Sequence, residues 1–209
     1  MNVIALVPLT ENDHRLSGAL INFQGESLLS HAVRGLLHSE CVDRVIVAGP
    51  PQNTTVYSAA LESVADTRVR VVAGGAGRSE SVRSALAAHS VRPSDIVLVH
   101  DPARPFTPAA TIRAVIESVR SGAPSAVPVE LVTDTIKLVD SDDVIRGTRD
   151  RSTLRSTQSP QAFRAEVLRD TGLDPLGEQV HTVAGHPHAM RIATSFDLAV
   201  AEALLNSEK

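Results

Sequence analysis

Sulfur and aromatic side chains are scarce in this sequence, and each shortage excludes a class of protein. The single cysteine, Cys41, has no partner within the chain, so an internal disulfide and a thiolate metal cluster are excluded. Tryptophan is absent and aromatic residues make up 2% of the chain, which argues against binding single-stranded nucleic acid by base stacking. The formal net charge of −4 provides no basic field for nucleic acid or an anionic membrane. We therefore expect neither as a partner.

Long apolar runs are lacking as well. No stretch approaches the roughly 20 apolar residues of a membrane helix, and residues 1–8 lack the basic start and apolar stretch of a signal peptide. These absences predict a cytoplasmic protein. Apolar residues nevertheless make up 43% of the 209 positions, which suits one folded domain over residues 1–209 with a sizeable core.

Short apolar segments alternate with amphipathic segments along most of the chain. Strands are predicted at 3–9, 44–48, 69–73, 95–100, 125–129 and 189–193. Helices are predicted at 27–37, 56–65, 79–89, 107–119 and 195–205, the last two with Thr107 and Ser195 as N-caps. The alternation predicts a mostly parallel sheet with helices on both faces. Ligands of such sheets bind beyond the carboxyl ends of the strands.

A different pattern follows Val129. Apolar and polar residues alternate on either side of the acidic turn at 140–143, which predicts a two-stranded antiparallel arm over about 130–155. An isolated hairpin is unstable in water, so we expect the arm to pack on something. A partner subunit is one candidate.

The segment His-Asp-Pro-Ala-Arg-Pro at 100–105 is the sharpest candidate site. Asp101 ends a predicted buried strand, and its carboxylate is a hard oxygen ligand suited to Mg²⁺. Arg104 lies three residues further on and can hold a phosphate. The alternative is structural: Asp101 caps a turn and Arg104 pairs with it.

Two further segments have a phosphate-binding character. The glycine-rich run at 74–81 enters a predicted helix, and glycines together with helix N-termini favour anions. It matches neither a Walker loop nor a dinucleotide fingerprint, so a flexible turn with a serine cap is its alternative. Segments 134–137, 148–151 and 158–161 carry hydroxyls and cations suited to a phosphorylated substrate, or form a solvated ribbon.

Taken together and in order, these motifs resemble the 2-C-methyl-D-erythritol 4-phosphate cytidylyltransferases of non-mevalonate isoprenoid biosynthesis. The matching segments are 74–81, 97–105, 134–137, 148–151, 159–163 and 197–199. The resemblance implies a Rossmann-like α/β nucleotidyltransferase fold and a homodimer joined by the arm. It also implies transfer of CMP from CTP to methylerythritol phosphate, a small phosphorylated sugar alcohol, with release of pyrophosphate.

The same resemblance implies roles for particular residues. Asp101 would hold Mg²⁺, Arg191 falls where the family has a lysine near the phosphates, and Arg15 is the fixed cation left in the N-terminal loop. Gly75, Arg78 and Ser81 would approach the nucleotide, while Arg104, Thr135 and Arg151 would hold the sugar phosphate, the last two across the dimer.

Three departures from the family pattern keep other functions open. The loop at 8–18 has no glycine before Gly18, and its Glu11 and Asp13 would repel a triphosphate. A segment before His181 is missing, and a late acidic residue of the family is replaced near 186–189. The alternatives are a catalytically inactive homologue that binds or regulates a partner, and a transferase for a different nucleotide or phosphosugar.

Overall fold

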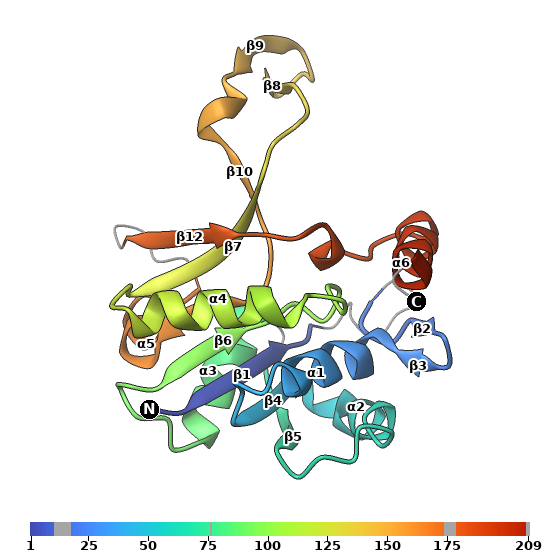
Figure 1. Ribbon diagram of the computed structural model, residues 1–209, viewed down its shortest axis with the longest axis vertical. Coiled ribbons are helices and arrows are strands. Elements are labelled where there is room, and N and C mark those ends of the chain that lie inside the picture. The colour runs from blue at the N-terminus through green and yellow to red at the C-terminus, as the bar shows by residue number, and fades with distance from the viewer. Residues whose placement is uncertain (11–17, 76, 174–178, 208–209) are drawn as a thin grey trace.

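An eight-stranded sheet runs through the described part of the chain, which comprises residues 1–10, 18–75, 77–173 and 179–207 of a computed structural model (Figure 1). In order across the sheet, the strands are β10 (Arg155–Thr157), β7 (Ser125–Leu131), β11 (Gln161–Arg164), β6 (Ile96–Val99), β1 (Val3–Pro8), β4 (Arg44–Gly49) and β5 (Val69–Ala73), with β12 (Val180–Ala184) paired to β7.

The sheet is mostly parallel around β1. Strands β6, β1, β4 and β5 all run in the same direction, as does the pair β7 and β12. Strand β11 is antiparallel to both β6 and β7. The predicted mostly parallel sheet is therefore confirmed, and the carboxyl ends of its four central parallel strands share one edge.

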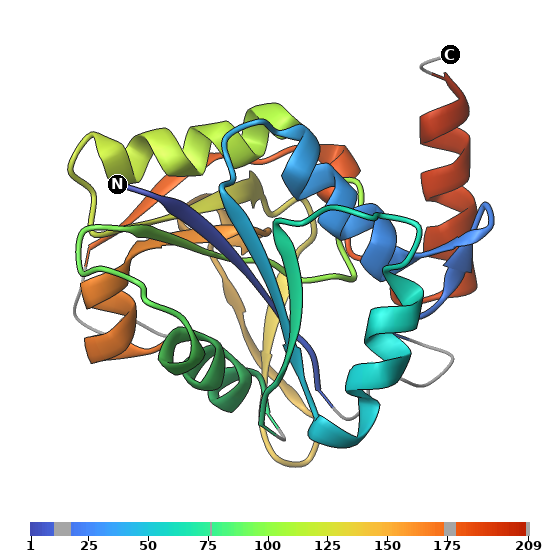
Figure 2. The same ribbon diagram turned by 90° about the horizontal axis from the view of Figure 1, so that it is seen from below.

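Helices cover both faces of this sheet (Figure 2). Helices α1 (Leu28–His38) and α4 (Ala109–Arg120) lie on one face, and α3 (Arg78–Ala88) and α5 (Ala165–Thr171) lie on the other. Successive side chains of a strand point to opposite faces. Accordingly, Val3, Ala5 and Val7 of β1 join the first core, whereas Ile4 and Leu6 join the second.

A smaller layer flanks the carboxyl edge. The hairpin of β2 (Asn22–Phe23) and β3 (Glu26–Ser27) packs against α6 (Ser195–Ser207), sharing an apolar cluster of Phe23, Leu28, Ile192 and Ala201. Helix α2 (Thr54–Ala60) contacts β5. Three short 3-10 turns complete the described elements: η2 (Pro51–Asn53), η3 (Arg151–Thr153) and η4 (Pro187–Ala189).

The predicted arm is confirmed as an antiparallel pair. Strands β8 (Ile136–Val139) and β9 (Ile145–Arg149) form its tip, and Figure 1 shows it standing away from the sheet on β7 and β10. Five of its apolar side chains are exposed, among them Leu131 and Ile145, which are 70% and 61% accessible. None of the helices in the described ranges is long and apolar enough to cross a membrane.

Two predicted details of the carboxyl-terminal half are wrong. Residues 189–193 do not form a strand; η4 occupies part of this segment, and β12 is the strand that pairs with β7. Helix α4 begins at Ala109 with Pro108 as its N-cap. Thr107 instead donates its hydroxyl to the backbone oxygens of Arg104 and Ser159, at 3.1 and 3.2 Å.

The start of α6 also differs from the prediction. Ser195 is its first helical residue, and the capping contacts come from the neighbouring positions. The Asp197 amide donates to Thr194 Oγ1 at 3.2 Å, and the Asp197 carboxylate accepts the Thr194 amide at 2.7 Å. These reciprocal contacts satisfy two backbone amides at the helix N-terminus, those of Thr194 and Asp197.

Candidate active site

The loops that follow β1 and β5 meet at the carboxyl edge, where Ser81 of α3 ties them together. Its hydroxyl oxygen lies 3.2 Å from the Leu9 carbonyl oxygen and 3.2 Å from the Gly75 amide, which donates to it. The side chain is fully buried. Ser81 was predicted to approach the nucleotide; the structure places its hydroxyl beneath the loop, as part of the scaffold that shapes it.

The glycines at 74–75 are required by close packing. A Cβ on Gly74 would lie 2.6 Å from Ser81 Oγ and 2.9 Å from the Gly49 amide nitrogen, and a Cβ on Gly75 would lie 2.2 Å from the Glu80 Cβ. Real Cβ atoms do not approach other atoms this closely. The absence of side chains lets the loop lie against the start of α3.

Asp101 follows β6 and forms an ion pair with Arg191. The carboxylate oxygen Oδ2 accepts Arg191 Nε at 3.2 Å, while Oδ1 accepts the Ala103 amide at 2.9 Å. The side chains of Asp101 and Arg191 are 24% and 57% exposed, so solutes can reach the pair. The structure therefore brings together two residues that were predicted as catalytic, although they lie 90 positions apart in the sequence.

Arg104 holds two other segments against the Asp101 loop. Its guanidinium donates to the Ala189 carbonyl at 2.6 Å and to the Thr157 carbonyl at 3.2 Å. The pKa of Arg104 is lowered, mainly by burial. The negative charge of Asp101 opposes this shift, and the positive charge of Arg191 adds to it. The alternative that Asp101 caps a turn and pairs with Arg104 is thus confirmed only in its first half. Asp101 does cap a turn, but its ion-pair partner is Arg191.

Beneath Asp101 lies a buried polar pair that sequence reasoning missed. The Asp101 amide donates to Ser159 Oγ at 2.8 Å, and the same oxygen lies 3.0 Å from Nδ1 of His100. Both side chains are buried. The sequence carried a signal, since His100 and Ser159 both lie in motif segments, but nothing in their spacing of 59 positions indicated that they touch.

His100 is neutral at physiological pH. Its pKa is lowered to about 4, mainly by burial; the negative charge of Asp101 opposes this shift, and the positive charges of Arg104 and Arg78 add to it. A neutral imidazole can accept the Ser159 hydroxyl hydrogen at Nδ1, which leaves the Ser159 oxygen to accept the Asp101 amide. The pair fixes the backbone of the residue that carries the carboxylate.

Two arginines, Arg104 and Arg191, act on the Asp101 carboxylate, and a third, Arg78, acts on the neighbouring His100. Arg78 opens α3 and acts electrostatically on His100, as Arg104 does, and Arg191 contacts Asp101 directly. Positive charge at a helix N-terminus beside a glycine loop favours an anionic ligand. The arrangement can bind phosphate groups and neutralise negative charge that develops on them.

The donor set at Asp101 fits Mg²⁺ in one binding mode. Among the residues that the structure describes, no group of three or more His, Cys, Asp or Glu side chains could hold a metal ion. Mg²⁺ commonly binds one or two carboxylates together with substrate phosphates. A carboxylate offers about four lone-pair sites, and Asp101 uses two of them for Ala103 and Arg191.

Two of the predicted substrate residues lie on the arm. Thr135 is exposed between β7 and β8, and Arg151 is exposed in η3, where its guanidinium donates to the Thr133 carbonyl. Within the described residues no contact joins either to Asp101 or Arg104, so one chain does not assemble all the predicted positions. Arg15, Glu11 and Asp13 lie outside the described residues.

Comparison with known proteins identifies the family. The family model of 2-C-methyl-D-erythritol 4-phosphate cytidylyltransferase (IspD) matches residues 12–173. The protein of that name from Saccharopolyspora erythraea is 48% identical over 98% of this chain and 100% of its own length. Their alignment spans 224 positions, more than the 209 residues of this chain, so the relative carries additional residues.

Solved structures agree in fold. The crystal structure of 2-C-methyl-D-erythritol 4-phosphate cytidylyltransferase from Thermus thermophilus superimposes with a TM-score of 0.76 and 30% identity, covering 99% of this chain and all of the other. A 4-diphosphocytidyl-2C-methyl-D-erythritol synthase gives a TM-score of 0.84 and 26% identity, covering 98% of each chain. The eight-stranded sheet is therefore that of an α/β nucleotidyltransferase, and the chain belongs to the 2-C-methyl-D-erythritol 4-phosphate cytidylyltransferase family.

Proposed function

We propose that this protein transfers a cytidylyl group from CTP to the phosphate of 2-C-methyl-D-erythritol 4-phosphate and releases pyrophosphate. The single observation that carries the proposal is the accessible Asp101–Arg191 pair at the carboxyl edge, with Arg104 beside it. Its location matches the rule that ligands of open α/β sheets bind beyond the carboxyl ends of the strands. Family membership supplies the substrates.

The chemistry is a phosphoryl transfer. A phosphate oxygen of methylerythritol phosphate forms a bond to the α-phosphorus of CTP, and the bond from that phosphorus to the bridging oxygen of the β-phosphate breaks. The electron pair leaves with pyrophosphate. Such reactions are catalysed mainly by positioning and by charge stabilisation, which arginine side chains provide.

Three residues of the candidate site have distinct roles in this reaction. Arg191, half-exposed beside Asp101, binds the phosphates whose charge grows during the transfer. Arg78 lies at the start of α3, where the Gly75 loop and the helix N-terminus favour the nucleotide phosphates. Ser81 acts as a positioning residue, because its buried hydroxyl holds Gly75 in place.

Asp101 is the residue that would hold Mg²⁺. A bound Mg²⁺ supplies Lewis-acid charge neutralisation of the phosphates. The carboxylate retains lone pairs for an ion shared with the substrate. The His100–Ser159 pair keeps the Asp101 backbone in place, so the carboxylate is presented in one orientation.

We further propose that two copies associate through the arm. The arm exposes Leu131, Leu138, Val139, Val144 and Ile145, of which Val139 and Ile145 are paired at its tip, and a group of exposed apolar residues indicates an interaction surface. Association would also complete the site, because Thr135 and Arg151 do not contact the Asp101 region of their own chain. A partner's arm supplies a hydroxyl and a guanidinium for the sugar phosphate.

Pyrophosphate release tests the activity. Wild-type protein is incubated with CTP, Mg²⁺ and 2-C-methyl-D-erythritol 4-phosphate, and parallel reactions contain ATP, GTP or UTP instead of CTP. We expect turnover with CTP and its loss in Asp101→Asn. Asp170→Asn, which removes an exposed carboxylate from α5, serves as the matched control and should retain wild-type activity.

Two results would contradict the proposal. Absence of both turnover and calorimetric CTP binding in the wild type would show an inactive homologue. Turnover with another nucleotide in preference to CTP would show a transferase of different specificity.

A further inference from the structure

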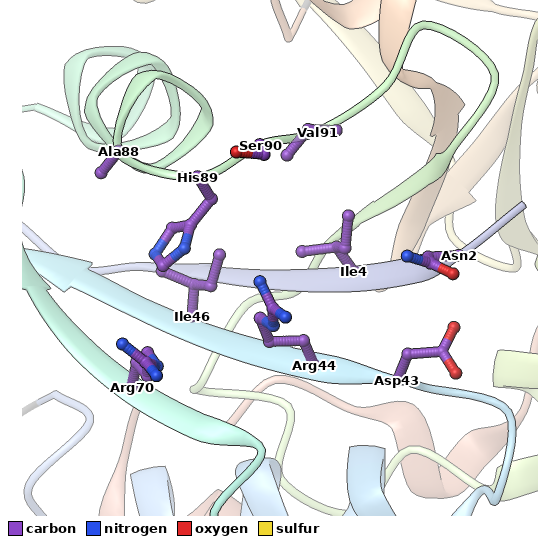
Figure 3. A pocket seen from close by; sticks show the side chains of 10 residues that line it. All are labelled: Asn2, Ile4, Asp43, Arg44, Ile46, Arg70, Ala88, His89, Ser90 and Val91. Atoms are coloured by element: carbon purple, nitrogen blue, oxygen red, sulfur yellow. The ribbon is translucent and has the colours of Figure 1, made fainter.

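A hollow lies at the amino edge of the sheet, opposite the candidate active site (Figure 3). Its volume is about 410 Å³, within the range of about 300–1,000 Å³ that is typical of ligand pockets. The hollow is bounded by the beginnings of β1, β4 and β5 and by the segment that follows α3. It therefore shares no lining residue with the Asp101 region.

The hollow exists because α3 ends before it reaches the first residues of the strands. Helix α3 stops at Ala88, while β1 and β4 extend further toward their amino ends. Ile4 pairs in register with Arg44, and Ile46 pairs with Arg70. Partners in neighbouring parallel strands face the same side, so two arginines border an apolar floor of Ile4 and Ile46 on the α3 face.

The charge in this hollow is positive. Arg44 and Arg70 are exposed and make no ion pair with any residue in the described ranges. The carboxylate of Asp43, at the rim, accepts the Val3 amide at 2.7 Å and so is turned toward the backbone. Two guanidiniums thus lie on one concave surface, and no carboxylate of the described residues forms an ion pair with either of them.

His89 lines the hollow and has a ring nitrogen that lacks a hydrogen-bond partner among the described residues. It hangs from the end of α3 toward the strands, with Arg44 extending toward it from the opposite side (Figure 3). Its Nε2 atom is buried and has no hydrogen-bond partner in the described structure. Burial lowers the pKa of His89, and the charges of Arg44 and Arg70 lower it further. A buried polar nitrogen without a partner is rare in folded proteins.

We propose that this hollow binds a small phosphate monoester. Its phosphate oxygens lie between the guanidiniums of Arg44 and Arg70 and accept a hydrogen bond from His89 Nε2, and its carbon portion lies against Ile4 and the exposed Ala88. Arginine forks match phosphate oxygens, and such charge-assisted hydrogen bonds are the strong ones. An anion there would also satisfy the unpaired imidazole nitrogen. This site is independent of the proposed transfer reaction.

Nuclear magnetic resonance of the histidine rings tests the site. The full-length protein is titrated with n-butyl phosphate and, separately, with inorganic phosphate, and the His89 signal is assigned by its absence in His89→Asn. The His100 signal reports the carboxyl edge in the same spectra. We expect the His89 signal to move saturably with n-butyl phosphate, and at least tenfold more weakly with inorganic phosphate.

A double variant provides the matched comparison. Arg44→Gln/Arg70→Gln should weaken n-butyl phosphate binding at His89 at least tenfold. Arg83→Gln/Arg120→Gln removes the same charge from exposed helix positions outside the hollow and should leave binding unchanged.

Three outcomes would overturn the proposal. They are a His89 signal that does not move saturably, equal weakening in both double variants, and equal affinity for the two probes, which would show that the apolar floor is not used. A circular dichroism melt of each variant confirms that it is folded, so a loss of binding refers to the site.

Discussion

At the scale of single residues, the site depends on groups that never touch a substrate. Ser159 satisfies the Asp101 amide and the His100 ring at once. Removing the hydroxyl in Ser159→Ala leaves two buried polar groups without that partner. We expect a loss of about 1–3 kcal/mol in the free energy of unfolding, measured by urea denaturation. Ser156→Ala, at an exposed position of β10, should change it by less than about 0.5 kcal/mol.

His100 makes the stability depend on pH. Its pKa is about 4 in the folded protein and about 6.5 in an unfolded chain, so the unfolded state binds more protons between these values. Stability is therefore complete above pH 6.5 and falls as the pH drops toward 4, by at most roughly 1.4 kcal/mol per pH unit. Urea denaturation at pH 7, 6, 5 and 4.5 measures this slope. His100→Gln should flatten it; an unchanged slope in that variant would contradict the assignment.

Arg191 is the cation that directly contacts Asp101. In Arg191→Gln the positive charge beside the phosphates is lost, and a shorter, neutral polar side chain remains. We expect kcat/KM for cytidylyl transfer to fall roughly 100-fold, as when one preorganised charge stabiliser is removed. Arg164→Gln breaks a weaker ion pair, with Glu166 at 3.8 Å, and should keep normal kinetics. Equal losses in the two variants would indicate a general effect of charge.

At the scale of elements, the glycine loop and α3 behave as one unit. In Gly74→Ala the new Cβ would meet Ser81 Oγ and the backbone of Gly49. We expect the free energy of unfolding to drop by about 1–3 kcal/mol, because overpacking displaces its neighbours. Thermal denaturation followed by circular dichroism measures the change. Gly77→Ala is the control, since a Cβ there meets nothing within 4 Å. A Gly74 variant as stable as this control would contradict the packing argument.

The elements that the sequence predicted well are those whose burial is continuous. Strands β1, β4 and β6 are almost entirely buried, so uninterrupted apolar runs marked them. Strand β12 was missed because four of its five residues are exposed and its pattern resembles a loop. The segment at 189–193, wrongly predicted as a strand, is apolar for another reason: Ala189 and Ile192 are buried in a turn region.

The candidate site was predictable only in part, for a related reason. Asp101 stands at the end of a strand, where the sequence itself points to a site, and Arg191 became a candidate through family resemblance. The ion pair between them, the buried His100–Ser159 pair and the contact of Ser81 with the Leu9 carbonyl join distant segments. Periodicity reports local structure, so it does not reveal which side chains of different elements meet.

At the scale of the whole molecule, the exposed arm determines the expected assembly. Ile145→Glu places a charge on an apolar side chain at its tip, 61% exposed in the single chain. We expect sedimentation velocity to show a shift from dimer to monomer, together with loss of transfer activity, because each site lacks the partner's arm. Val56→Glu, at an exposed apolar position of α2, should remain dimeric and active. A monomeric wild-type protein with full activity would contradict the arm-mediated assembly.

The arm is rooted in the sheet, and this has a consequence for the entropy of association. Strand β7 continues directly toward the arm and is hydrogen-bonded to β10, β11 and β12. The base of the arm, formed by β7 and β10, is thus part of the main sheet, unlike a flexible tether, whose ends sample many positions. A stiff element loses little conformational freedom when it docks. In the proposed dimer, Arg151 of η3, which directly precedes β10, would therefore reach the neighbouring subunit already oriented, with much of the ordering completed when the chain folds.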